Sequence, residues 1–136
     1  MRFIICFLLF ISFVSSFSKS KTTYESDKKK MAYDKLEEGF AENDLNKIAL
    51  GYYESGKFDS EIENLLMSNS WFNKALSIYK KKTPSFELGK TYQWLAINEL
   101  KSKNTKKAII YADSALGIFK KKLNRQRAYF PTIYLF

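Results

Sequence analysis

Apolar residues recur at helical spacing over most of the chain after residue 30. The clearest run keeps to one side of a helix for about six turns. It comprises Phe58, Ile62, Leu65, Phe72, Leu76 and Tyr79. No segment alternates polar and apolar residues for long enough to indicate a strand. The predicted fold is therefore all-α, with helices over residues 28–42, 44–55, 58–82, 85–102 and 105–122.

Residues that commonly begin or end helices separate these segments. Gly56 is expected to end a helix, because glycine readily adopts the left-handed conformation of a C-terminal cap. Thr83 and Pro84 are expected to begin the next helix, as an N-cap followed by proline at the first helical position. Asn104 is expected to cap the last one.

The sequence also repeats itself. Residues 72–82 (FNKALSIYKKK) and 112–122 (ADSALGIFKKK) agree at seven of eleven positions, counting Tyr79 and Phe119 as equivalent, at an offset of 40 residues. The preceding helices align at an offset of 47, which matches Ile48 and Ala49 to Leu95 and Ala96. The two offsets differ by 47 − 40 = 7 residues, or about two helical turns. We assign these residues to an extension of helix 58–82. The chain is thus predicted to use a pair of antiparallel helices twice.

Small and aromatic residues in these helices resemble the pattern of the tetratricopeptide repeat (TPR) family, over about residues 44–122. The positions concerned are Ala96, Ala108, Ala112 and Ala115 in the second unit, and Ala49, Gly56, Phe58 and Ala75 in the first. Glu61 departs from the pattern, since an early alanine is expected there. The long spacing is similar to the repeats of bacterial sensor and regulator proteins. The resemblance implies a short α-solenoid of stacked helix pairs, predicted over residues 31–122.

The family binds peptides in a groove lined by the first helix of each pair, so the resemblance also implies a binding surface. The candidate groove residues are Asn46, Leu50, Tyr53, Lys90, Gln93 and Ile97. Asn46 and Lys90 could together hold a peptide carboxylate, one as an amide donor and the other as a charge. Trp71 and Trp94 are assigned to the core, because aromatic residues at helical spacing are usually buried.

The first 18 residues have the three-part pattern of a secretory signal: Arg2, an apolar run over residues 3–14, and small residues at Ser16 and Ser18. Cleavage after Ser18 would leave 136 − 18 = 118 residues. An uncleaved membrane anchor and a buried N-terminal helix are the alternatives. Residues 19–30 are expected to form a polar, lysine-rich leader. The protein is therefore predicted to be exported, to the periplasm or the extracellular space.

Composition narrows the chemistry. The chain has no histidine and one cysteine, Cys6, which rules out His-based catalysis, Cys-cluster zinc sites and an intramolecular disulfide. It shows no phosphate-binding loop or nucleotide fingerprint. We expect the protein to have no enzymatic activity and to bind neither a cofactor nor a metal. Lysines and arginines outnumber acids by 23 to 14, and the basic excess gathers after residue 100. That region is interpreted as a solvated face, and no nucleic-acid partner is expected.

The C-terminal residues 123–136 end in an apolar and aromatic run. This tail could fold back over the last helix pair, dock on another chain, including a second copy, or begin a truncated further repeat. The last interpretation is preferred. Two functions follow: an exported, non-catalytic module that binds a peptide or partner domain, or an N-terminal sensory fragment of a membrane-bound histidine kinase or helix-turn-helix regulator whose output domain is missing.

Overall fold

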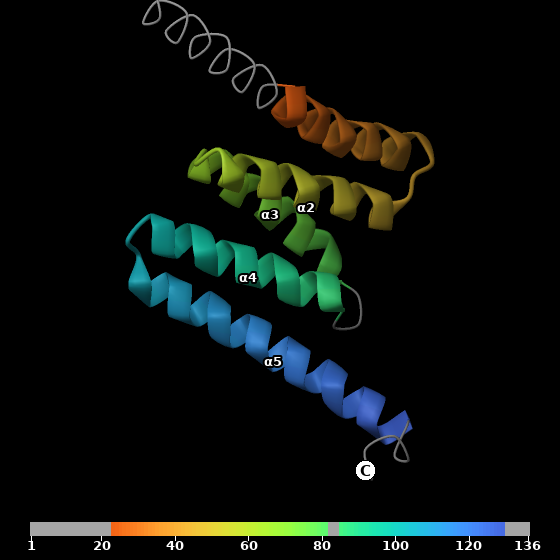
Figure 1. Ribbon diagram of the computed structural model, residues 1–136. Helices are drawn as coiled ribbons and strands as arrows, with labels where there is room; N and C mark the ends of the chain where they lie inside the picture. Colours follow the sequence, from red (N-terminus) through yellow and green to blue (C-terminus); the bar gives the residue numbers. More distant parts are fainter. Residues whose placement is uncertain (1–22, 82–84, 130–136) are drawn as a thin grey trace, which may run out of the picture.

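The computed structural model describes residues 23–81 and 85–129, and helices with short turns make up this part of the chain. A helical segment over residues 23–41 comes first. Four further helices follow: α2 (Leu45–Glu61), α3 (Leu65–Tyr79), α4 (Phe86–Lys101) and α5 (Thr105–Tyr129). They pack as antiparallel neighbours in chain order (Figure 1). The all-α prediction and the arrangement in helix pairs are confirmed. The predicted signal peptide (residues 1–18) and residues 130–136 lie outside the described part.

The helix boundaries differ from the predicted ones at several points. Helix 23–41 includes residues 23–30 of the predicted leader, and α5 continues to Tyr129, through half of the predicted tail. The cap of α4 is Ser85, whose hydroxyl accepts from Leu88 N at 3.2 Å, in place of Thr83. Asn104 precedes α5 as expected, and its side chain accepts from Lys107 N at 3.5 Å.

Gly56 does not end a helix, contrary to the prediction. It lies inside α2, and no described glycine has a positive φ. The reason for glycine here is tight packing, since a Cβ at Gly56 would be 2.8 Å from Cδ1 of Phe72 on α3. The chain turns later, at Glu63, a non-glycine residue with φ of 63°. Helices 44–55 and 58–82 are therefore replaced by α2 and α3.

The relocated turn shows that one period of 40 residues runs through both helix pairs. Glu63 and Lys103 are the left-handed residues between α2 and α3 and between α4 and α5. The rings of Tyr52 and Trp71 lie 5.7 Å apart across the first pair. The equivalent rings of Tyr92 and Tyr111, each forty residues later, lie 6.1 Å apart across the second. The predicted offset of 47 for the first helices is therefore wrong, because the residues matched at that offset do not occupy equivalent positions in the two pairs.

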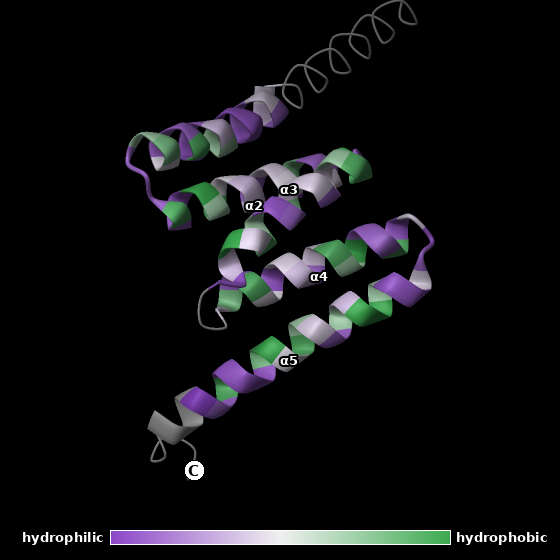
Figure 2. Ribbon diagram, turned by 180° about the vertical axis from the view of Figure 1, so that it is seen from behind, coloured by the Kyte–Doolittle hydropathy of each residue, from purple (hydrophilic) through white to green (hydrophobic). Residues whose placement is uncertain are grey.

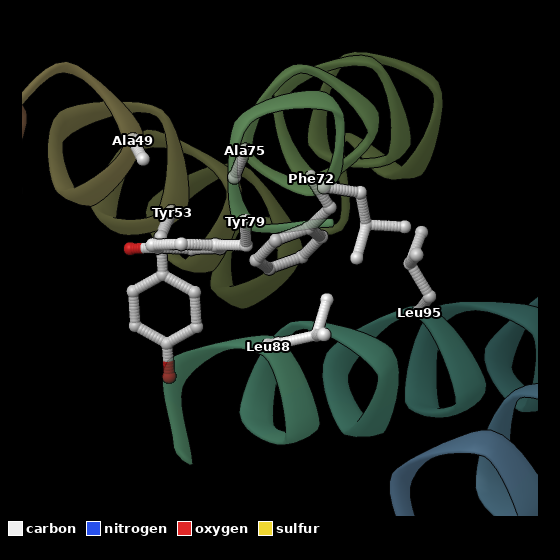
Figure 3. Close-up of a cluster of buried hydrophobic side chains, with 8 residues drawn as sticks. Ala49, Tyr53, Phe72, Ala75, Tyr79, Leu88 and Leu95 are labelled. Carbon is white, nitrogen blue, oxygen red and sulfur yellow. The ribbon is translucent and has the colours of Figure 1, made fainter. Parts of the chain in front are cut away.

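An apolar core joins the two pairs between α2, α3 and α4. Tyr53, Phe72 and Tyr79 belong to one buried cluster with Leu88 and Leu95 of α4, and Figure 3 shows the rings of Tyr53 and Phe72 on the side of α2 and α3 that faces α4. Phe72 is fully buried, and its ring stacks at 6.2 Å on that of Trp94. Ala49 and Ala75 are also fully buried, because they lie where α2 and α3 approach closely.

A buried polar cluster joins the same helices at Asn98 of α4. Asn98, Ser60 of α2 and Ser68 of α3 are all fully buried. The Ser60 hydroxyl donates to Asn98 Oδ1 at 2.6 Å, and Asn98 Nδ2 donates to Ser68 Oγ at 2.7 Å. Asn98 Nδ2 also donates to Asn69 Oδ1 at 2.8 Å. A shift of α4 along its neighbours would leave these buried groups without hydrogen-bond partners. Each unsatisfied group would cost about 1–3 kcal/mol of stability.

Two glycine substitutions test the packing at Gly56. We expect Gly56→Ala to lower the free energy of unfolding by about 1–3 kcal/mol, because the added methyl meets the Phe72 ring and overpacks the core. Gly117→Ala in α5 is the matched control, since a Cβ there has nothing within 4 Å. It should raise stability by up to about 1 kcal/mol through helix propensity. Urea unfolding of both variants makes the measurement, and equal shifts would contradict this packing.

Candidate functional site

The first helices of the two pairs, α2 and α4, carry all six residues predicted for the groove. Asn46, Lys90 and Gln93 are exposed, and Leu50 and Ile97 are half-buried. The period of 40 residues makes Leu50 equivalent to Lys90, whereas Asn46 is equivalent to Phe86. The Lys90 ammonium lies 4.6 Å from the centroid of the Phe86 ring. Asn46 and Lys90, the predicted carboxylate pair, thus occupy different positions of the repeat.

Tyr53 is a core residue, which corrects its assignment to an accessible groove. Only 8% of its surface is exposed, and its ring centroid lies 5.9 Å from that of Phe72. Its hydroxyl accepts a hydrogen bond from Trp94 Nε1 at 3.2 Å. Tyr53 therefore links α2 to α4 beneath the surface that a ligand would contact.

We define the α2–α4 face by the half-buried or exposed residues that follow from the repeat. They are Leu50, Glu54 and Lys57 on α2 and the equivalent Lys90, Trp94 and Ile97 on α4. On each helix these residues stand at positions i, i+4 and i+7, so they share one side. Glu54 and Lys57 were not predicted to be site residues, and Trp94 was predicted to belong to the core alone. Applying the 40-residue period to the whole unit would have found all three.

Contacts connect the members of this face. Trp94 donates a hydrogen bond to the Tyr53 hydroxyl, and the Lys57 ammonium lies 5.7 Å from the centroid of the Tyr53 ring. Lys57 also pairs with Glu54 at 3.1 Å. Farther along, Lys101 Nζ donates to the Ser60 carbonyl oxygen at 2.6 Å, which ties the end of α4 to α2. The face thus combines apolar side chains with lysines that lie over aromatic rings.

A pocket of about 200 Å³ extends the face toward helix 23–41. Glu54 and Lys57 of α2 form one of its sides, and Lys28, Met31 and Lys35 of helix 23–41 form the other. The ion pair between Lys28 and Glu61, at 2.7 Å, spans the two helices beside it. The hydrogen bond from Lys28 to Glu61 raises the pKa of the Lys28 ammonium. The pocket offers both charge signs around an apolar floor that includes Ala32 and Phe58.

Two tyrosines beneath the face have altered acidity. Burial raises the pKa of Tyr53, although the hydrogen bond from Trp94 acts in the opposite direction. Burial raises the pKa of Tyr79 to about 12. Both shifts have the same direction, because the apolar interior around these phenols disfavours a negative charge.

The structure describes no metal-binding cluster: among residues 23–81 and 85–129, no three acidic or cysteine side chains converge. No helix in those ranges is long and apolar enough to cross a membrane.

Alkaline unfolding tests the environment of Tyr79. The folded-state pKa of about 12 exceeds the usual value of 10.0, so above pH 10 the unfolded chain releases a proton that the folded chain keeps. The contribution of this phenol is complete below pH 10 and falls by about 1.4 kcal/mol per pH unit up to pH 12. We expect Tyr79→Phe to make the free energy of unfolding fall less steeply in this range. Parallel curves for the variant and the parent chain would be inconsistent with a buried phenol.

Comparison with known proteins adds no relative. The chain matches no protein-family model, and no match was found among curated proteins or solved structures. The repeat and the α2–α4 face therefore rest on the chain's own residues and on the arrangement of its helices.

Proposed function

We propose that this chain is an exported, non-catalytic interaction module of the TPR family, which binds a peptide segment of a partner protein along the α2–α4 face. The observation that supports this most is the repetition of one surface. The side chains of the face on α2 recur forty residues later on α4, at equivalent positions of that helix. In both helices these side chains are only partly buried. Such a surface can contact successive residues of a peptide without any chemical step.

The side chains of the face suggest which peptides would bind. Trp94 and Ile97 are half-buried and offer apolar contact area, while Lys90 offers positive charge; Lys57 is already paired with Glu54. Trp94 is held by its stacking on Phe72 and its bond to Tyr53, so its position is set before a ligand arrives. A pre-formed anchor lowers the entropy cost of binding. The preferred ligand is therefore a peptide with an acidic residue close to an apolar or aromatic one.

Selection of peptides from a random phage-displayed library against the full chain tests this proposal. We expect enriched peptides to carry an acidic residue beside an apolar one. The double variant Lys90→Glu with Ile97→Asp should weaken their binding by about tenfold or more, which is about 1.4 kcal/mol. Lys106→Glu is the control for charge reversal, because this exposed lysine lies on α5, away from the face.

Selected peptides that bind the parent chain and the double variant equally would place the binding surface elsewhere. Failure to enrich any sequence class would argue that the face does not bind peptides.

A further inference from the structure

Three leucines spaced by forty residues differ in how far they are covered. They are Leu36 in helix 23–41, Leu76 in α3 and Leu116 in α5. Their exposed fractions are 7%, 4% and 50%. Leu36 packs against α2, where a Cβ on Gly51 would lie 2.7 Å from Leu36 Cγ. Leu76 belongs to the buried cluster that contains Leu88 and Leu95 of α4. In the described part of the chain, only Leu116 has no following helix to cover it.

Leu116 belongs to a larger apolar surface that we call the α5 outer face. It consists of Leu100 at the end of α4 and Ile109, Ala112 and Leu116 on α5. The three α5 residues stand at positions i, i+3 and i+7 and thus form one stripe. All four side chains are exposed. Figure 2 shows hydrophobic bands along α5 before its strongly hydrophilic C-terminal part.

The equivalent surface of the first helix pair is the surface of α3 on which α4 packs, which we call the seat of α4. Asn69, Phe72 and Leu76 of α3 are the counterparts of Ile109, Ala112 and Leu116. Asn69 accepts a hydrogen bond from Asn98 of α4, and Phe72 stacks on Trp94 of α4. The chain therefore shows what occupies this surface when it is filled: the first helix of the next pair.

The α5 outer face differs from that seat in its chemistry. The polar partners of Asn98, namely Ser60, Ser68 and Asn69, are replaced by Leu100, Ala108 and Ile109. An amide buried here would find no partner among these side chains, which is unfavourable. Ala112 in place of Phe72 also leaves room for a larger side chain. The helix that fits must carry an apolar residue where α4 carries Asn98.

A second copy of this chain fits poorly. The helix equivalent to α4 within the described chain is α2, and helix 23–41 covers the corresponding side of α2 through Leu36. Two α5 helices brought together would also juxtapose their lysines, which include Lys106, Lys107 and Lys120.

We propose that the α5 outer face docks the first helix of a partner helix pair, and that this helix has the apolar stripe of α4 with Asn98 replaced by an apolar residue. This surface lies on the second helix of its pair and is distinct from the proposed peptide-binding face on α2 and α4.

Two matched peptides test this assignment against the full chain. Both have the sequence of residues 85–102 and are cross-linked to stay helical; one keeps Asn98 and the other carries Asn98→Leu. Fluorescence anisotropy should show the leucine peptide binding about tenfold or more tightly. Leu116→Glu in the full chain should abolish this binding. Leu66→Glu should leave it unchanged, because Leu66 of α3 is 87% exposed and lies outside the α5 outer face.

Three results would overturn the proposal. Equal affinity of the two peptides would contradict the apolar match at the Asn98 position. Binding that survives Leu116→Glu would place the contact elsewhere. A dimer in sedimentation experiments that Leu116→Glu dissociates would assign the face to a second copy of the chain.

Discussion

The hydrogen bonds of one buried amide determine how the two helix pairs fit together. Asn98 of α4 is fully enclosed and bonds to Ser60 of α2 and to Ser68 and Asn69 of α3. Apolar packing between helices tolerates small shifts, but these bonds have narrow limits on length and angle. The amide therefore selects one position of α4 along its neighbours. The stacking of Phe72 on Trp94 and the bond from Trp94 to Tyr53 depend on that position.

The same constraint links the core to the candidate binding surface. Trp94 lies one turn before Asn98 on α4, so fixing the amide also fixes the indole on the α2–α4 face. One repeat later, the polar partners of the amide are replaced by Leu100, Ala108 and Ile109, and the corresponding surface is exposed. The surface that holds α4 is polar near Asn98, whereas the α5 outer face is apolar at the equivalent positions. A helix with a buried amide finds hydrogen-bond partners on the first surface only, so each surface should discriminate against the helix that fits the other.

Periodicity was sufficient to predict the class of fold and the use of helix pairs, since apolar spacing and the repeated FNKALSIYKKK and ADSALGIFKKK segments are local signals. The break at Gly56 was predicted wrongly, because glycine is as compatible with close helix contact as with a helix end. The turn is instead at Glu63, which adopts a left-handed conformation. Glutamate is not a residue type from which this conformation is predicted. The offset of 47 residues for the first helices was a separate error, since it relied on matches of apolar and small residues such as Ile48 with Leu95 that the structure does not place at equivalent positions. Asn46 was paired with Lys90 for the chemistry of their side chains alone, and the period of 40 residues puts them at different positions of the repeat. Tyr53, also predicted to line the groove, is a core residue.

A double-mutant cycle between Ser60→Ala and Asn98→Ala tests the central role of the amide most directly. Free energies of unfolding of the two single variants and the double variant give the coupling between the side chains. If the bond from Ser60 to Asn98 holds α2 against α4, the coupling should be at least about 1 kcal/mol. Ser55→Ala is the control partner, because its hydroxyl donates to the Gly51 carbonyl within α2. Additivity of Ser60→Ala and Asn98→Ala to within about 0.3–0.5 kcal/mol would contradict the account.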